Sequence, residues 1–240
     1  MKLFGKEFTT DARRTRRRTC LLALSVLRVF VVIAAIVSVA SAQTTQPPAE
    51  APKKANVRTP EVPAVMAEPF DGAPVDKMAA QCVTLETEIG AIQLEMIPEV
   101  APESVRNFLN LAVTGAFDTT TFSRVVKDFV IQGGNLATSE RWSAELSKRA
   151  SRKIPDEPGL IKHVRGIVSM ARPDEPNSAS THFFILVGNG SHLDGKFAAF
   201  GRVIKGIEVA DAINRAPVDG EKPVKPVRIN RAVVAPCISK

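Results

Sequence analysis

The stretch that decides the fold reads Phe122-Ser-Arg-Val-Val-Lys-Asp-Phe-Val-Ile-Gln-Gly-Gly134. Its apolar residues predict a β-strand with one face toward a core, and the simplest interpretation leaves Arg124 at an exposed edge. Phe122, Arg124 and Gln132 have the same parity, so a regular strand would place a guanidinium and an amide beside an aromatic ring. The glycine pair then allows another backbone to approach closely. These details argue against a purely structural strand.

The sequence around this stretch predicts short strands and two helices. Residues 82–96 alternate apolar and polar positions on either side of Gly90, which predicts a hairpin. Pro102 fits the first turn of a helix that ends at Gly115, and a second helix is expected over Ile207–Asn214. Other runs have strand character: Thr121–Gln132, Gly166–Ala171, His182–Val187, Ala198–Ile204 and Val227–Val234. Many short strands without a βαβ rhythm favour an antiparallel barrel capped by helices.

The formal charge of +7 lies almost entirely before residue 43. Residues 1–42 hold eight basic and two acidic residues, which leaves the remaining chain at +1. A nearly neutral domain has no strong field for phosphate groups. The aromatic content is 5% and tyrosine is absent, which argues against a stacking surface for single strands. We therefore expect no nucleic acid partner.

The same N-terminal stretch has the layout of a secretory signal. An apolar run over residues 29–39 follows the basic region, and Ala40-Ser41-Ala42 predicts cleavage between Ala42 and Gln43. The uninterrupted run is too short for a spanning helix, which needs roughly 20 residues. The alternative is an uncleaved anchor from Cys20 to Ala42. We expect an exported, periplasmic protein, or in the alternative one anchored in the membrane and facing the periplasm.

Residues 43–77 contain seven prolines and show no apolar periodicity. Prolines disfavour helix interiors and central strands, so this segment is expected to be a flexible linker. The folded domain is then expected to span residues 78–240.

The segment Phe122–Gly134 resembles the cyclophilin signature Phe-x-Arg-Val-x-x-x-Phe-x-x-Gln-Gly-Gly. Three further blocks resemble that family in the same order, namely Arg165–Ala171, Asn177–Ile185 and Leu193–Gly201. The likeness spans roughly residues 82–234. It implies a mainly β fold, a closed eight-stranded antiparallel barrel capped by two helices. It also implies peptidyl-prolyl cis-trans isomerase activity without a cofactor or a metal.

The resemblance assigns roles to individual residues. Arg124 would be the catalytic guanidinium, because a fixed, charged fork can stabilise the twisted prolyl amide. Gln132 would orient the substrate backbone beside it. The remaining positions would bind the substrate, the first four of them as an apolar pocket for the proline ring: Phe129, Val130, Phe184, Leu193, Ala171, Arg172, His182, His192 and Phe197.

Four positions depart from the family pattern. Ser123 replaces a common histidine, His182 replaces a glutamine, and Phe197 replaces a histidine or tyrosine. His192 stands where some members carry a tryptophan that contacts cyclosporin, so weak cyclosporin inhibition is expected. None of the four removes Arg124, and we expect activity with an altered substrate preference.

The segment after Gly134 differs from the family's glycine-rich loop. Residues 139–150 predict a short extra helix with Ser139 as N-cap and with Trp142 and Leu146 on one face. It is interpreted either as a surface helix that buries Trp142 or as an added wall beside the groove.

In the family resembled here the first and last strands pair antiparallel, which implies a disulfide between Cys82 and Cys237. The three histidines, His163, His182 and His192, are too scattered for a metal signature. We expect a monomer whose partners are proline-containing unfolded or flexible polypeptides. The alternative function is a non-catalytic proline-peptide-binding module or holdase, although the presence of Arg124 favours the enzyme.

Overall fold

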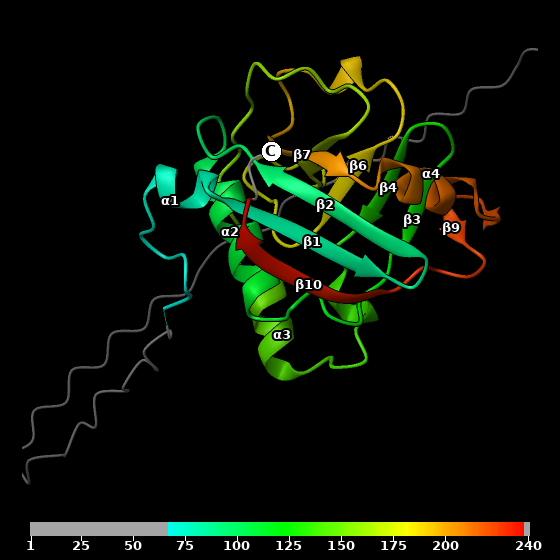
Figure 1. The fold of residues 1–240 in the computed structure, drawn as a ribbon, viewed down its shortest axis with the longest axis horizontal. Helices are drawn as coiled ribbons and strands as arrows, with labels where there is room; N and C mark the ends of the chain where they lie inside the picture. Colours follow the sequence, from blue (N-terminus) through cyan, green and yellow to red (C-terminus); the bar gives the residue numbers. More distant parts are fainter. Residues whose placement is uncertain (1–66, 238–240) are drawn as a thin grey trace, which may run out of the picture. The chain divides into compact units, whose positions relative to one another are not determined.

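The computed structural model describes residues 67–237, so the predicted signal segment and most of the predicted linker lie outside the described residues. Figure 1 shows a curled sheet with helices packed against it. The helices are α1 (Val75–Ala79), α2 (Pro102–Val113), α3 (Ala144–Ala150) and α4 (Ile207–Arg215), with short 3-10 turns η1 (Leu136–Thr138) and η2 (Ser191–Leu193). The strands are β1 (Gln81–Thr87), β2 (Gly90–Met96), β3 (Arg124–Val126), β4 (Val130–Gly133), β5 (Ile167–Met170), β6 (Phe183–Leu186), β7 (Ala199–Lys205), β8 (Val218–Asp219), β9 (Lys222–Pro223) and β10 (Ile229–Pro236).

Eight strands form one antiparallel sheet in the order β10-β1-β2-β7-β5-β6-β4-β3. The mainly β fold is confirmed, but the expected closed barrel is an overstatement: the sheet is a curled half-barrel. Its edge strands β3 and β10 do not pair along their length, and one bridge joins Thr121 to Arg228. The reason is local, because the N–H of Val125 in β3 donates to the carbonyl of Glu221 beside β9.

The main core fills the inside of the curled sheet. It is dense in aromatic rings: the ring of Phe108 on α2 lies 5.1 Å from Phe117, 5.1 Å from Phe183 and 4.9 Å from Phe200. Helix α2 lies behind β1 and β10 in Figure 1, and α4 contacts β2, β3 and β4. Both helices occupy the ranges that the apolar spacing predicted.

The domain begins before the residue expected from the sequence. Residues 67–77, the end of the predicted linker, pack onto α2, with Phe70 buried. The N–H of Phe70 donates to Asn110 Oδ1 at 2.8 Å, and Arg106 Nη1 donates to the Phe70 carbonyl at 3.0 Å. One proline of this segment is part of the fold, because Pro74 is the N-cap residue of α1.

The run Thr121–Gln132, expected as one strand, is a hairpin of β3 and β4. It turns at Asp128, whose φ of 56° is left-handed. Buried Asn214 on α4 holds this turn: its Nδ2 donates to the carbonyls of Val126 (2.8 Å) and Val130 (3.1 Å). Its Oδ1 accepts the N–H of Asp128 at 2.9 Å. The position of the hairpin is therefore fixed by α4.

The extra helix exists but begins later than expected. Ser143 is the N-cap of α3, with its Oγ accepting from the N–H of Leu146 at 3.2 Å. Ser139 is buried and donates to the Asp118 carbonyl at 2.9 Å, so the predicted N-cap is wrong. Trp142 precedes the helix and is 45% exposed. The interpretation of a helix that buries Trp142 is therefore also wrong.

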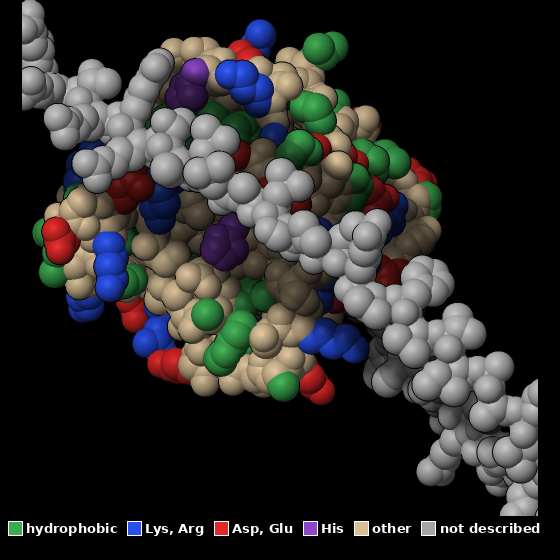
Figure 2. Space-filling model, turned by 180° about the vertical axis from the view of Figure 1, so that it is seen from behind, with side chains coloured by type: hydrophobic (Ala, Val, Ile, Leu, Met, Phe, Trp, Pro, Cys, Tyr) green, Lys and Arg blue, Asp and Glu red, His purple; other side chains and the backbone are tan. Residues whose placement is uncertain are grey.

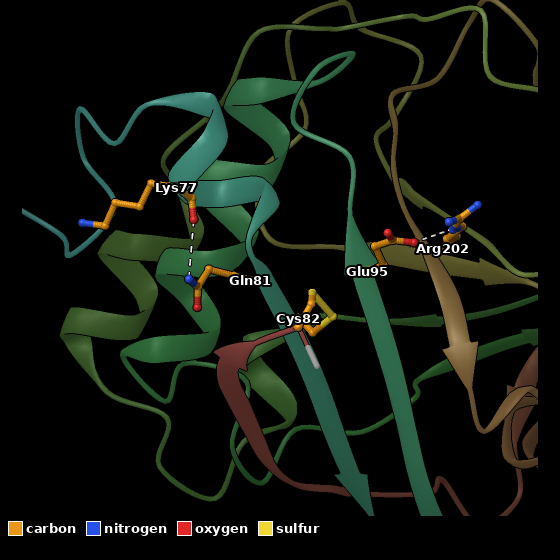
Figure 3. Close-up of a disulfide and its surroundings, with 6 residues drawn as sticks. Lys77, Gln81, Cys82, Glu95 and Arg202 are labelled. Carbon is orange, nitrogen blue, oxygen red and sulfur yellow. Dashed lines mark hydrogen bonds and ion pairs between the residues drawn. A yellow bond between two sulfur atoms is a disulfide. The ribbon is translucent and has the colours of Figure 1, made fainter. Parts of the chain in front are cut away.

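A disulfide joins Cys82 to Cys237, the pairing that the resemblance implied. The Cα atoms are 4.9 Å apart, because Cys82 pairs with Ala235 across β1 and β10 and the Cys237 N–H donates to the Ala80 carbonyl. Figure 3 shows the bridge close to the Glu95–Arg202 ion pair between β2 and β7.

None of the helices within residues 67–237 is long and apolar enough to cross a bilayer. In the same part of the chain, no three His, Cys, Asp or Glu side chains gather as a metal site would require. On the face shown in Figure 2, basic and acidic side chains are interspersed and no single sign of charge dominates.

Candidate active site

Three predicted site residues lie in one row across neighbouring strands. Arg124 in β3 pairs with Gln132 in β4, and Gln132 pairs with Phe184 in β6. Directly paired residues project from the same face of a sheet. The row therefore places a guanidinium, an amide and an aromatic ring side by side on the outer face. The sequence predicted that Arg124 and Gln132 lie together on one face of a single strand. In the structure they do lie together, but across the β3–β4 hairpin.

The guanidinium of Arg124 is held at three nitrogens. Its Nη1 donates to Gln132 Oε1 at 3.2 Å. Its Nε and Nη2 donate to the two carboxylate oxygens of Glu221 at 2.7 and 3.1 Å. An arginine has five N–H groups, so one N–H on Nη1 and one on Nη2 remain. The hydrogen bond from Arg124 and its positive charge lower the pKa of Glu221, which is therefore ionised at neutral pH.

Gln132 is also held from its other side. Its Nε2 lies 3.4 Å from Nδ1 of His182. Burial lowers the pKa of His182, which favours the neutral ring, and a neutral ring with the proton on Nε2 accepts at Nδ1. His182, which stands where the family has glutamine, thus orients the Gln132 amide so that its oxygen faces Arg124.

An apolar pocket of about 210 Å³ opens beside this row. It is lined by nine of the residues assigned from the sequence: Arg124, Phe129, Val130, Gln132, Ala171, Arg172, Phe184, Leu193 and Phe197. Its floor belongs to a second buried cluster, separate from the main core, that includes Val130, Phe184 and Leu186. Strands β4 and β6 therefore bury one face in the main core and use the other for the pocket.

Arg172 braces the rim of this pocket with its side chain. Its Nε pairs with Asp156 at 3.1 Å, and its guanidinium lies 5.2 Å from the centre of the Phe197 ring. Nη1 donates to the Pro173 carbonyl at 2.9 Å, and Nη2 to the Lys196 carbonyl at 3.3 Å. The resemblance had assigned Arg172 to substrate binding, and Arg172 lines this pocket.

A larger cavity of about 700 Å³ adjoins the pocket and shares Arg124, Gln132, Ala171 and Arg172 with it. His182 and Trp142 line this cavity. The second interpretation of residues 139–150, an added wall beside the groove, agrees with this position of Trp142.

The other two histidines, of which His192 was assigned to substrate binding, line neither cavity. His192 is exposed on η2, and its ring centre is 5.1 Å from that of Phe129. His163 is buried, with Nδ1 3.3 Å from Asp194 and Nε2 3.2 Å from Ser169 Oγ. Burial lowers the pKa of His163.

Two charged contacts of the site were missed by the sequence reasoning. Asp156 and Glu221 lie outside the four blocks, and each pairs with an arginine distant in the chain. Nothing in local spacing indicates either contact. The only available signal for Glu221 was its place in Asp219-Gly-Glu-Lys222, a typical turn sequence that marks a tight hairpin.

A small apolar pocket beside an immobilised guanidinium, on the outer face of a curled antiparallel sheet, is the arrangement of a peptidyl-prolyl cis-trans isomerase. Residues 82–234 match the family model described as cyclophilin type peptidyl-prolyl cis-trans isomerase/CLD, and the chain belongs to this family.

Named relatives and solved structures agree with this assignment. The chain is 40% identical over 141 residues to the peptidyl-prolyl cis-trans isomerase CYP23 of Arabidopsis thaliana, covering 58% of this chain and 62% of that protein. It is 38% identical to cypE of Dictyostelium discoideum, covering 65% of this chain and 98% of the relative. A cyclophilin type isomerase from Cryptosporidium parvum aligns with a TM-score of 0.57 and 30% identity, covering 65% of this chain and 97% of that one. A second structure of the Cryptosporidium protein was determined in the presence of the dipeptide Ala-Pro.

Proposed function

We propose that this chain isomerises X–Pro bonds of exported proteins and so assists their folding, with Arg124 stabilising the twisted amide. The observation that carries the proposal is the guanidinium of Arg124, held at three nitrogens beside the apolar pocket with two N–H groups left to donate. The need for such catalysis follows from timescale, because uncatalysed isomerisation takes tens to hundreds of seconds.

The mechanism is electrostatic. Rotation about the prolyl amide has a barrier of about 18–20 kcal/mol, because the planar state has partial double-bond character. Twisting the bond localises a lone pair on the proline nitrogen, and a donor that is already in place favours this twisted state over the planar one. The apolar pocket holds the proline ring while the free N–H groups of Arg124 face the amide. No covalent intermediate is required.

The exported location rests on the signal layout of residues 1–42 and on the disulfide. Disulfides persist in oxidising compartments such as the periplasm, and the Cys82–Cys237 bridge is compatible with such a compartment. In this proposal the protein acts as a monomer on unfolded or flexible proline-containing chains. N-terminal sequencing of the protein from its native host tests the export step: a start at Gln43 supports cleavage, and a retained Met1 favours the anchored alternative.

The test of the mechanism compares the purified mature protein with its Arg124→Ala variant in a proline-tetrapeptide isomerisation assay. We expect kcat/KM to fall by about 10²-fold, the usual effect of removing a transition-state donor. Arg202→Ala is the matched control, since Arg202 pairs with Glu95 away from the groove. Background-level rates for both the parent and Arg124→Ala would refute the catalytic proposal. If the parent then still suppressed aggregation of an unfolded client, the holdase alternative would be favoured.

A further inference from the structure

Glu221 lies at the turn of the β8–β9 hairpin, far in sequence from the segment that carries Arg124. Both of its carboxylate oxygens accept from the Arg124 guanidinium, at 2.7 Å from Nε and 3.1 Å from Nη2. Its backbone carbonyl accepts the N–H of Val125 at 2.8 Å. The residue therefore contacts β3 twice, once through its main chain and once through its side chain.

The main-chain contact fixes where the carboxylate stands. The hairpin pairs Asp219 with Lys222 and Val218 with Pro223, and the Val224 N–H donates to the Pro217 carbonyl at 3.0 Å. Gly220 takes a left-handed φ of +60°, which a tight turn of this kind requires. Because the turn is bonded to the strand next to Arg124, the carboxylate is held in place before any substrate arrives.

We infer that Glu221 is a positioning residue for the isomerisation, one that orients the Arg124 fork toward the substrate amide. This inference rests on the proposed role of Arg124. A bidentate arginine–carboxylate pair fixes both the rotation and the plane of the guanidinium. With Glu221 holding Nε and Nη2, and with Gln132 holding Nη1, the two remaining N–H groups have fixed directions. Without Glu221, Gln132 would hold the guanidinium by a single hydrogen bond.

The expected size of the effect follows from exposure. The side chains of Arg124 and Glu221 are 41% and 56% exposed, so solvent screens their attraction. An exposed pair with bidentate geometry supports about a five-fold change in rate, well short of the loss expected for Arg124→Ala. We expect the substitution of Glu221 to lower kcat and not to change KM, since Glu221 does not line the apolar pocket that would bind the proline ring.

The experiment measures kcat and KM separately for a proline tetrapeptide with Glu221→Ala, Glu221→Gln and, as a charge-matched control, Asp219→Asn on the same hairpin. We expect Glu221→Ala to lower kcat about five-fold with little change in KM. Glu221→Gln keeps the size and one acceptor oxygen, so it should regain part of the loss. Asp219→Asn should match the parent. Urea unfolding of each variant checks that the fold is kept, and Glu221→Gln remains a test if the alanine variant fails to fold.

The decisive arm repeats Glu221→Ala in the Arg124→Ala background. If Glu221 acts only through Arg124, the second substitution causes no further loss, which is the non-additivity of two coupled residues. Equal losses in both backgrounds, or a Glu221→Ala variant as fast as the parent, would overturn the inference. A slow Arg124→Ala variant beside a fully active Glu221→Ala variant refutes only the positioning role. A fully active Arg124→Ala variant refutes the proposed mechanism itself.

Discussion

Helix α2, which closes the main core, depends at its N-terminus on a residue far away in sequence. Its N-cap, Ala101, has no side-chain cap, and the carboxylate of Glu157 takes that place. One Glu157 oxygen accepts the Glu103 N–H at 2.9 Å; the other accepts the Ser104 N–H and Ser104 Oγ, both at 2.7 Å. The negative charge also faces the positive end of the helix dipole. Glu157→Ala should therefore destabilise the whole domain.

The magnitude can be worked from these contacts. Loss of a helix cap costs about 1–2 kcal/mol. Ser104 is fully buried, so its N–H and hydroxyl lose a partner where water is excluded, which adds about 1 kcal/mol. We expect a fall of about 2–3 kcal/mol in the free energy of unfolding, and roughly half of that for Glu157→Gln, which keeps an acceptor.

Urea unfolding at constant m-value measures this change. Glu103→Ala is the matched control: it removes a carboxylate from the same helix end, where Glu103 makes only a half-exposed pair with Arg106 at 3.3 Å, and it should cost less than about 1 kcal/mol. A Glu157→Ala variant within about 0.5 kcal/mol of the parent would refute the reasoning, since such a value is typical of surface substitutions without a structural role.

Two further predictions concern histidines. Burial lowers the pKa of His163 and of His182 in the folded protein, so below the unfolded value of about 6.5 the unfolded chain binds more protons. Stability should therefore fall with pH below about 6.5, by up to about 1.4 kcal/mol per pH unit for each histidine, and His163→Asn should flatten the pH dependence measured by urea unfolding. A slope unchanged by this substitution would contradict this expectation, because it would show that His163 takes up its proton over the same pH range in the folded and the unfolded states. His192 is exposed beside the ring of Phe129, at the position where some members of the family carry a tryptophan that contacts cyclosporin. Cyclosporin should therefore inhibit this protein weakly. Inhibition at nanomolar concentration would contradict that assignment.

The sequence predicted much of the fold because its apolar periodicity reflects burial directly. Helices α2 and α4 and the β1–β2 hairpin lie where spacing placed them. The sequence did not predict the fold correctly where the backbone conformation of a single residue sets the direction of the chain. Asp128 adopts a left-handed φ that no apolar pattern reports, so a hairpin was taken for a strand. The linker boundary was misplaced for a related reason, since composition alone does not distinguish a proline in a linker from Pro74 at the start of α1.

The candidate site was predicted in its apolar part and missed in its ionic part. The pocket residues come from strands whose register follows from hydrophobic pattern, so the four blocks carry them together. An ion pair needs only two oppositely charged side chains within contact distance, and such a pair produces no periodic pattern in the sequence. Asp156 and Glu221 were therefore visible only once the chain was folded.

These two carboxylates change what the groove presents to a peptide. Arg124 and Arg172 line both cavities, which would suggest a cationic groove with a preference for acidic peptides. Each guanidinium is instead paired, with Glu221 at 2.7 Å and with Asp156 at 3.1 Å, so little net positive charge is left to attract an anion. What remains is directional: two N–H groups on Arg124, beside an apolar pocket of about 210 Å³. We therefore expect the groove to select for a proline ring and an amide in a defined orientation, and not for the charge of the residues that flank them.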